Sequence, residues 1–266
     1  MHIKLYFFIF LFLFVVESKS KCLKSRIVRI IEGGPADQRN FPFIVSIIYN
    51  GYHTCGASLI TSRYVLTAAH CAYSRHQLID ERYTFISVGS SRWEEGTKYG
   101  VSKIYVHDEY NNDRVVNDIA LLKTDKKVRF STYIRPGKLY GNELPKQSGL
   151  ECIVIGWGYT SNNGYLVKSA ADVLNKVKIT TISPQRCRRY YRNVDERNIC
   201  LTGIGRQGSC SGDSGGPLLT DIDGNLVQIG LVSYGGDCNN TAPEVYTKIS
   251  YFKDWILNSV KLLDAN

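Results

Sequence analysis

The chain has 266 residues and a formal net charge of +9. Six lysines and arginines but only one glutamate fall in the first 29 residues, so the remainder carries only +4, which does not favour nucleic-acid binding. Eight cysteines without a CxxC pair or a dense cysteine–histidine cluster argue against zinc and predict disulfides formed in an oxidising compartment.

The first twenty residues predict a secretory signal peptide. Lys4 precedes an apolar run over residues 5–16, and the small residues Ser18 and Ser20 predict cleavage after Ser20. The alternative is a membrane anchor, but a run of this length is short against the roughly 20 residues that a spanning helix needs. We therefore expect a secreted, extracellular protein without a membrane association.

Short runs rich in Val, Ile, Tyr and Phe follow, separated by Gly, Asn, Asp and Ser, and they predict an all-β fold. The clearest runs are FIVSIIY (43–49), YTFISVG (83–89), CIVIGWG (152–158), VQIGLVSYG (227–235) and EVYTKI (244–249). One helix is predicted at about 250–263, where Phe252, Trp255, Ile256 and Val260 share a face. The sheet-rich part is long enough for two small antiparallel barrels.

Three short motifs carry the groups that nucleophilic catalysis by a hydroxyl requires. LTAAHC contains His70, NDIALLK contains Asp118 and GDSGGP contains Ser214. A hydroxyl needs a base to take its proton, and the base needs an orienting acceptor. The backbone N–H groups of Gly212 and Ser214 are candidates for an oxyanion hole. Each motif alone also suits a structural histidine, a turn or a loop, but the three in this order favour catalysis.

These motifs resemble the signatures of the chymotrypsin-type serine proteases. FPFIVSI, GWG, LVSYGG and PEVYTKI extend the resemblance over nearly the whole chain after the leader. It implies two packed six-stranded antiparallel barrels, at about 30–136 and 137–250, with a C-terminal helix. It also implies a monomeric serine endopeptidase that cuts protein or peptide substrates through an acyl-enzyme and needs no cofactor. Ser233 and Gly235 are then expected to pair with the substrate backbone.

The resemblance further implies an inactive precursor, with a signal peptide at 1–20, a propeptide at 21–29 and a protease domain at 30–266. VRIIEGG predicts a cut between Arg29 and Ile30 by a trypsin-like protease. The new ammonium group of Ile30 is expected to pair with Asp213, which is uncompensated before cleavage.

Three disulfides follow from the resemblance: Cys55–Cys71, Cys187–Cys200 and Cys210–Cys238. Cys22 and Cys152 remain. Thr220 stands where relatives often carry the partner of Cys152. Either Cys22 bridges to Cys152 and tethers the propeptide, or both are free thiols, and both alternatives stay open.

The primary specificity pocket departs from the trypsin pattern. Gly208 stands at the floor position, where trypsin-like members carry Asp. Together with a small Ser211 at the rim and glycines at 235 and 236, this neutral floor suits a large apolar side chain. Glu244 replaces a glycine of the pocket wall and either accepts a substrate Lys or turns away. We expect a preference for Phe, Tyr or Leu with secondary cleavage after Lys or Arg.

Three further interpretations concern surface features, and a fourth concerns the function of the whole chain. Glu94 and Glu95 alone provide too few ligands for calcium, so no metal is expected. Asn239 opens a glycosylation sequon whose occupancy stays open. RCRRYYRN (186–193) is more typical of a solvated surface than of a binding exosite. A non-catalytic homologue with a binding role is the alternative function, and it is disfavoured because such homologues usually lack a triad member.

Overall fold

The computed structural model describes residues 33–162, 165–167, 169–203, 207–235, 238 and 242–265. The expected signal peptide, the activation site at Arg29 and Ile30, Cys22 and the sequon at Asn239 lie outside these residues.

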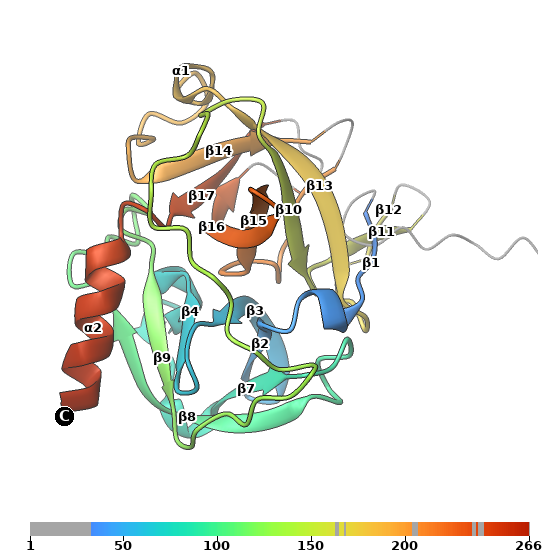
Figure 1. Ribbon diagram of the computed structural model, residues 1–266, viewed down its shortest axis with the longest axis vertical. Helices are drawn as coiled ribbons and strands as arrows, with labels where there is room; N and C mark the ends of the chain where they lie inside the picture. Colours follow the sequence, from blue (N-terminus) through green and yellow to red (C-terminus); the bar gives the residue numbers. More distant parts are fainter. Residues whose placement is uncertain are drawn as a thin grey trace, which may run out of the picture.

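Six antiparallel strands close into the first barrel (Figure 1). Around the barrel they are β2 (Ile44–Tyr49), β3 (Tyr52–Leu59), β4 (Tyr64–Thr67), β9 (Ala120–Thr124), β8 (Thr97–Val106) and β7 (Thr84–Val88). Asn50 and Gly51 join β2 to β3 with φ angles of 51° and 85°, as a two-residue hairpin turn with positive φ at both positions requires. Inward-facing apolar side chains such as Val45, Ile47 and Ile86 fill the interior.

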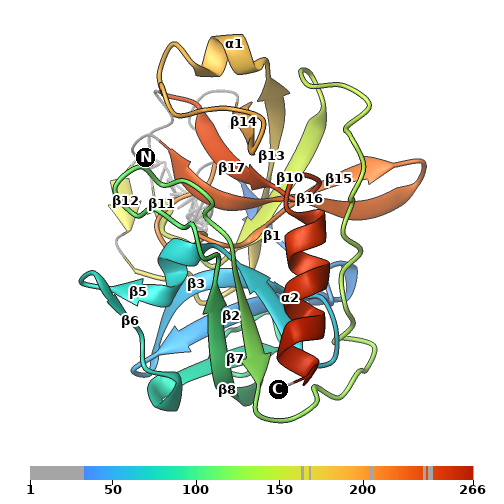
Figure 2. The same ribbon diagram turned by 90° about the vertical axis from the view of Figure 1, so that its left-hand side faces the viewer.

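The second barrel also has six strands, because β14 pairs back onto β13. The strands are β13 (Asn175–Ile182), β10 (Glu151–Gly156), β15 (Pro217–Ile222), β16 (Asn225–Gly235), β17 (Glu244–Lys248) and β14 (Asn198–Thr202). A short strand β1 (Gly34–Pro35) adds to the edge of β13. The second barrel lies above the first in both Figure 1 and Figure 2, and this two-barrel architecture confirms the expected fold class.

Short elements connect the strands. They are η1 (Gln38–Asn40), η2 (Ala69–Ala72), β5 (Tyr73–Ser74), β6 (Gln77–Leu78), η3 (Glu81–Tyr83), β11 (Thr160–Asn162), β12 (Tyr165–Val167) and α1 (Pro184–Cys187). Within the described part of the chain, no helix combines the length and the hydropathy that crossing a membrane requires.

The C-terminal helix α2 (Lys253–Ala265) lies against the outside of the first barrel (Figure 2). It begins three residues later than the sequence pattern suggested, because Phe252 N–H still closes a turn onto Ile249 O. The predicted apolar face is buried as expected: Phe252 and Ile256 are 3% exposed, and Trp255 stacks on Tyr105. The helix thus covers an apolar cluster that contains residues of both barrels.

Candidate active site

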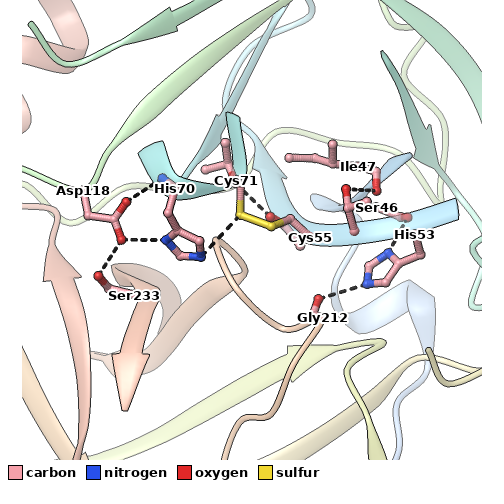
Figure 3. The surroundings of a disulfide bond; sticks show 12 residues. Ser46, Ile47, His53, Cys55, His70, Cys71, Asp118, Gly212 and Ser233 are labelled. Carbon is pink, nitrogen blue, oxygen red and sulfur yellow. Dashed lines mark hydrogen bonds and ion pairs between the residues drawn. A yellow bond between two sulfur atoms is a disulfide. The ribbon is translucent and has the colours of Figure 1, made fainter. Parts of the chain in front are cut away.

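His70 is held at the surface between the barrels by the turn η2 and a disulfide. η2 follows β4, and Cys71 within it bonds to Cys55 of β3 (Figure 3). The side chain of His70 is 26% exposed, so one edge of the imidazole is reachable from solvent.

Asp118 accepts three hydrogen bonds at one buried carboxylate (Figure 3). His70 donates Nδ1–H to Oδ2 at 2.8 Å and its backbone N–H to Oδ1 at 2.9 Å, and Ser233 Oγ donates to Oδ2 at 2.5 Å. Burial alone would raise the pKa of Asp118, but the charge of His70 and these hydrogen bonds lower it below its ordinary value. Burial would lower the pKa of His70, but Asp118 outweighs it and raises the pKa. The Nδ1–H donor leaves Nε2 unprotonated in the neutral ring.

The Ser214 turn is brought to the same region by backbone contacts with the first barrel. Gly56 N–H, next to Cys55, donates to Ser214 O at 2.8 Å. A Cβ on Gly215 would lie 3.0 Å from Ala68 N, two residues before His70. Ser214 is half-buried, and within the described residues its hydroxyl makes no hydrogen bond to His70. The structure therefore joins His70 to Asp118 directly. It packs the turn that contains Ser214 and Gly215 against Gly56 and Ala68 of the first barrel.

The backbone N–H groups of Gly212 and Ser214 have no hydrogen-bond acceptor among the described residues. Tyr159 N–H donates to Ser211 O at 2.7 Å, and Gly216 N–H donates to Asp213 O at 2.9 Å. The carbonyl of Ser211 shares a peptide with the N–H of Gly212, and the carbonyl of Asp213 shares a peptide with the N–H of Ser214. Because a trans peptide directs its N–H away from its carbonyl, the N–H groups of Gly212 and Ser214 point away from Tyr159 and Gly216. Such a pair of free donors can bind an oxyanion.

Ser46 and His53 support this turn, and the sequence motifs gave no signal for them. His53 Nε2–H donates to Gly212 O at 2.9 Å, and Ser46 Oγ lies 2.8 Å from His53 Nδ1 (Figure 3). Burial lowers the pKa of His53 to about 4, so the ring is neutral and donates from Nε2 while Nδ1 accepts from Ser46. Gly212 itself has a φ of 97°, which favours glycine.

Asp213 is a buried carboxylate without a cationic partner among the residues that the structure describes. It is 0% exposed, and its oxygens accept from Gly158 N at 2.8 Å and Cys210 N at 3.0 Å. Burial raises its pKa to about 7 despite these bonds. A Cβ at Gly158 would lie 2.2 Å from Asp213 Oδ2, so this site requires glycine there.

The residues expected in the specificity pocket surround a buried glutamate. Gly208 is buried, whereas Ser211 and Gly235 are exposed. Glu244 is 6% exposed and is paired with Gly235 across β16 and β17.

Both oxygens of the Glu244 carboxylate accept hydrogen bonds. Ser209 donates its N–H and its Oγ at 2.8 Å each, and Tyr246 OH donates at 2.5 Å. Burial still raises the pKa of Glu244 above its ordinary value. The sequence gave no indication of Ser209 or Tyr246 as partners of this glutamate.

Three disulfides join described residues: Cys55–Cys71, Cys187–Cys200 and Cys210–Cys238. They are the pairs that the resemblance implied. Cys152 is 0% exposed within the core of the second barrel and has no disulfide partner among the described residues, where burial raises its thiol pKa to about 12. Because Cys22 lies outside those residues, a bridge between Cys22 and Cys152 and two free thiols both stay open.

One cluster in the described residues brings three potential metal-ligating side chains together, namely Cys55, His70 and Cys71. Its sulfurs are joined as a disulfide, so they are not the thiolates that a metal such as zinc binds. Glu94 and Glu95 are exposed, and Oε1 of Glu95 lies 3.7 Å from Nε of Arg92. Independence from metals stays a prediction.

Comparison with known proteins gives the family. The chain matches the trypsin family over residues 30–256. A trypsin of Phaedon cochleariae is 37% identical over 237 residues, which cover 86% of this chain and 87% of that protein. Chymotrypsin-2 of Vespa crabro is 34% identical, over 85% of this chain and 98% of that protein. The solved structure of neuropsin, a serine protease expressed in the limbic system of mouse brain, aligns with a TM-score of 0.75 and 27% identity, over 87% of this chain and 100% of that chain. The chain therefore belongs to the trypsin family of serine proteases.

Proposed function

We propose that Ser214, His70 and Asp118 form the catalytic triad of a secreted serine endopeptidase. The observation that carries the proposal is the 2.8 Å bond from His70 Nδ1 to Asp118, because it leaves Nε2 as the free base. The two unoccupied N–H groups of the Ser214 turn support it as an oxyanion hole.

In the proposed reaction, His70 Nε2 takes the hydroxyl proton of Ser214 while the hydroxyl oxygen attacks the carbonyl carbon of the scissile peptide bond. The N–H groups of Gly212 and Ser214 bind the oxyanion. The imidazolium of His70 then protonates the leaving amine, and an acyl-enzyme remains on Ser214. Water, deprotonated by the same nitrogen, releases the acid and restores the hydroxyl, while Asp118 stays ionised throughout.

We propose that the chain is made as a zymogen. In this proposal residues 1–20 are removed as a signal peptide, and a trypsin-like protease then cuts between Arg29 and Ile30. The buried carboxylate of Asp213, which has backbone donors but no described cation, supports an ion pair with the new ammonium group of Ile30. Formation of that pair would order the turn that carries Gly212 and Ser214.

We further propose a chymotrypsin-like preference for Phe, Tyr or Leu before the scissile bond, with secondary cleavage after Lys or Arg. Gly208 leaves the floor without a charge. Glu244 is held beside Ser209, the neighbour of Gly208, so a negative charge lies at the pocket wall and can pair with a basic side chain.

Labelling by a fluorophosphonate tests the proposed nucleophile. The purified chain is cleaved with trypsin, and the labelled residue is then identified by mass spectrometry. We expect a label on Ser214 and turnover of peptide substrates, and loss of both in Ser214→Ala. Ser211→Ala serves as the control for a nearby serine and should still be labelled. A cleaved, folded chain that neither labels nor turns over a peptide would favour the non-catalytic binding role.

A further inference from the structure

The arginine-rich stretch noted in the sequence lies at the outer end of the second barrel (Figure 2). α1 and the turn after it carry Arg186, Arg189 and Arg192, which are exposed, as is Arg114 of the first barrel. None of the four side chains forms an ion pair with a residue in the described part of the chain. We call these four residues the arginine surface.

The charge of this region is positive overall. Residues 113–114 and 186–197 together contain six arginines and three acids. One acid, Asp195, accepts from Arg197 Nε at 2.9 Å and is thereby neutralised, and the other two are exposed. Unpaired guanidinium groups therefore dominate the electrostatic potential of this surface.

Two contacts place one end of the arginine surface beside the proposed substrate-binding strand. Asn193, which follows Arg192, donates Nδ2–H to Arg114 O at 3.4 Å, so the turn of the second barrel meets the loop of the first. Tyr191 packs edge-on against Tyr234 with ring centroids 5.4 Å apart. Arg192 thus directly follows Tyr191, whose ring packs on Tyr234, and Arg114 lies in the loop that Asn193 contacts.

Tyr234 lies in a stretch of β16 with an open edge. Pairing between β15 and β16 ends at Pro217–Leu231, whereas β17 continues along the other side to Gly235. Within the described residues, Ser233–Gly235 have no strand partner on the β15 side. An extended peptide can add to such an edge, with a rise of about 3.3 Å per residue. A substrate that pairs over these residues would extend past Tyr234 toward Arg114 and Arg192.

We propose that Arg114 and Arg192 form a subsite that selects substrates with acidic residues about three to five positions before the scissile bond. This inference rests on the proposed proteolytic function and its substrate orientation. Exposed guanidinium groups form bidentate bonds with carboxylates, and the nearby rings of Tyr191 and Tyr234 offer apolar surface to the aliphatic part of a glutamate side chain.

An acidic peptide segment fits these observations better than a free polyanion. The segment is already bound through the residues near the scissile bond, so its carboxylates reach Arg114 and Arg192 at high effective concentration. The two arginines also lie beside the open strand edge and do not form a separate surface remote from it.

The test compares peptides that end in the same Phe before the scissile bond and carry Glu, Ala or Lys at the fourth and fifth positions upstream. kcat/KM is measured for the cleaved enzyme, per active site titrated with a fluorophosphonate. The variants are Arg114→Gln, Arg192→Gln and both together. Arg129→Gln, an exposed arginine after β9 in the first barrel, is the matched control.

We expect the Glu peptide to exceed the Ala peptide by about 3- to 10-fold at low salt, as two exposed ion pairs suggest, and the Lys peptide to be poorest. The preference should vanish in the double variant, persist in Arg129→Gln, and collapse in 1 M NaCl, where the screening length falls to about 3 Å.

Equal turnover of the Glu and Ala peptides, or a preference that survives in the double variant, would overturn the subsite. Arginine-dependent binding of a sulfated polysaccharide without any peptide preference would also overturn it, in favour of a polyanion site. No turnover of any peptide would overturn the proposed function and the subsite with it.

Discussion

A single buried carboxylate, Asp118, organises the chemistry of the candidate site. Its partners come from both barrels: His70 belongs to the first, and Ser233 and Thr247 belong to the second, with Thr247 Oγ donating to Asp118 O at 2.8 Å. The charge of His70 and the hydrogen bonds from His70 and Ser233 lower the pKa of the carboxylate despite burial, whereas the bond from Thr247 holds the backbone of Asp118. The bond from Nδ1 also orients the ring of His70. The protonation state and the orientation of His70 therefore depend on the same residue.

Replacing Asp118 by Asn should change both the rate and its pH dependence. Activity requires neutral His70, so kcat/KM should rise with pH through the pKa of His70, which Asp118 raises above its ordinary value of 6.5. Asp118→Asn should lower kcat by about 10⁴-fold, as in the serine protease triad. It should also shift the rise of kcat/KM with pH, which we call the acid limb of the pH profile, to lower pH. The measurement is kcat/KM from pH 5 to pH 9.

The matched control for this variant is Asp125→Asn, which removes an exposed carboxylate of the first barrel. It should leave the acid limb in place. An acid limb that does not move in Asp118→Asn would contradict the assignment of Asp118 as the group that raises the pKa of His70.

The buried carboxylate of Glu244 leads to a prediction about which residue the enzyme accepts before the scissile bond. Truncating one partner of a buried charge pair costs roughly 2–5 kcal/mol. Glu244→Gly should therefore lower kcat/KM for peptides ending in Lys by about 30-fold to a few thousandfold, while turnover after Phe holds or rises. Glu244→Gln, which keeps the size but not the charge, should have the same effect on Lys. A parent enzyme that ignores Lys and Arg would show that this glutamate does not determine specificity.

At the level of elements, α2 is anchored by polar contacts that its apolar pattern did not reveal. Tyr64 of β4, 2% exposed, donates its hydroxyl to Asp264 Oδ1 at 2.5 Å, and Lys123 Nζ donates to Leu263 O. The sequence predicted the buried face of α2 because periodicity reports burial. It did not predict these partners, because they lie 200 and 140 residues apart in the chain.

Removing the Tyr64 hydroxyl should loosen the helix. Tyr64→Phe keeps the buried ring and removes a hydrogen bond to a carboxylate, so the free energy of unfolding should fall by about 1–2 kcal/mol. The change is measured by urea unfolding of the Ser214→Ala chain, which prevents autolysis. Tyr251→Phe, at a ring that is 49% exposed, is the control and should have no effect. Equal stability of Tyr64→Phe and the parent would contradict the anchoring role.

At the scale of the whole molecule, the candidate site exists only where the barrels meet. Gly56 and His53 of the first barrel bond to Ser214 and Gly212 of the second, and Ser233 of the second bonds to Asp118. Motifs in the sequence predicted the barrels and His70, Asp118 and Ser214, because each motif is local. The role of His53 was missed because its partner is 159 residues away, and no local pattern encodes that contact. The orientation of Glu244 stayed open for the same reason.

Asp213 links activation to the stability of the whole molecule. Burial raises its pKa from 3.8 to about 7, so the folded chain binds a proton more tightly than the unfolded chain does. The free energy of unfolding of the uncleaved chain should therefore fall as the pH rises from about 4 to about 7, by roughly 4 kcal/mol at most. In the proposed activation, cleavage after Arg29 supplies the ammonium group of Ile30, which would stabilise the ionised carboxylate and should abolish this fall.

The measurement is urea unfolding of Ser214→Ala chains, cleaved and uncleaved, between pH 4 and pH 8. Ile30→Gly retains an ammonium group after cleavage but lacks the apolar side chain that seats it. Its cleaved form should therefore follow the uncleaved profile and, with Ser214 present, should be nearly inactive. Identical pH profiles for the cleaved and uncleaved chains, or full activity in Ile30→Gly, would show that Asp213 gains no partner on cleavage. The active conformation would then require another source of order for the turn that carries Gly212 and Ser214.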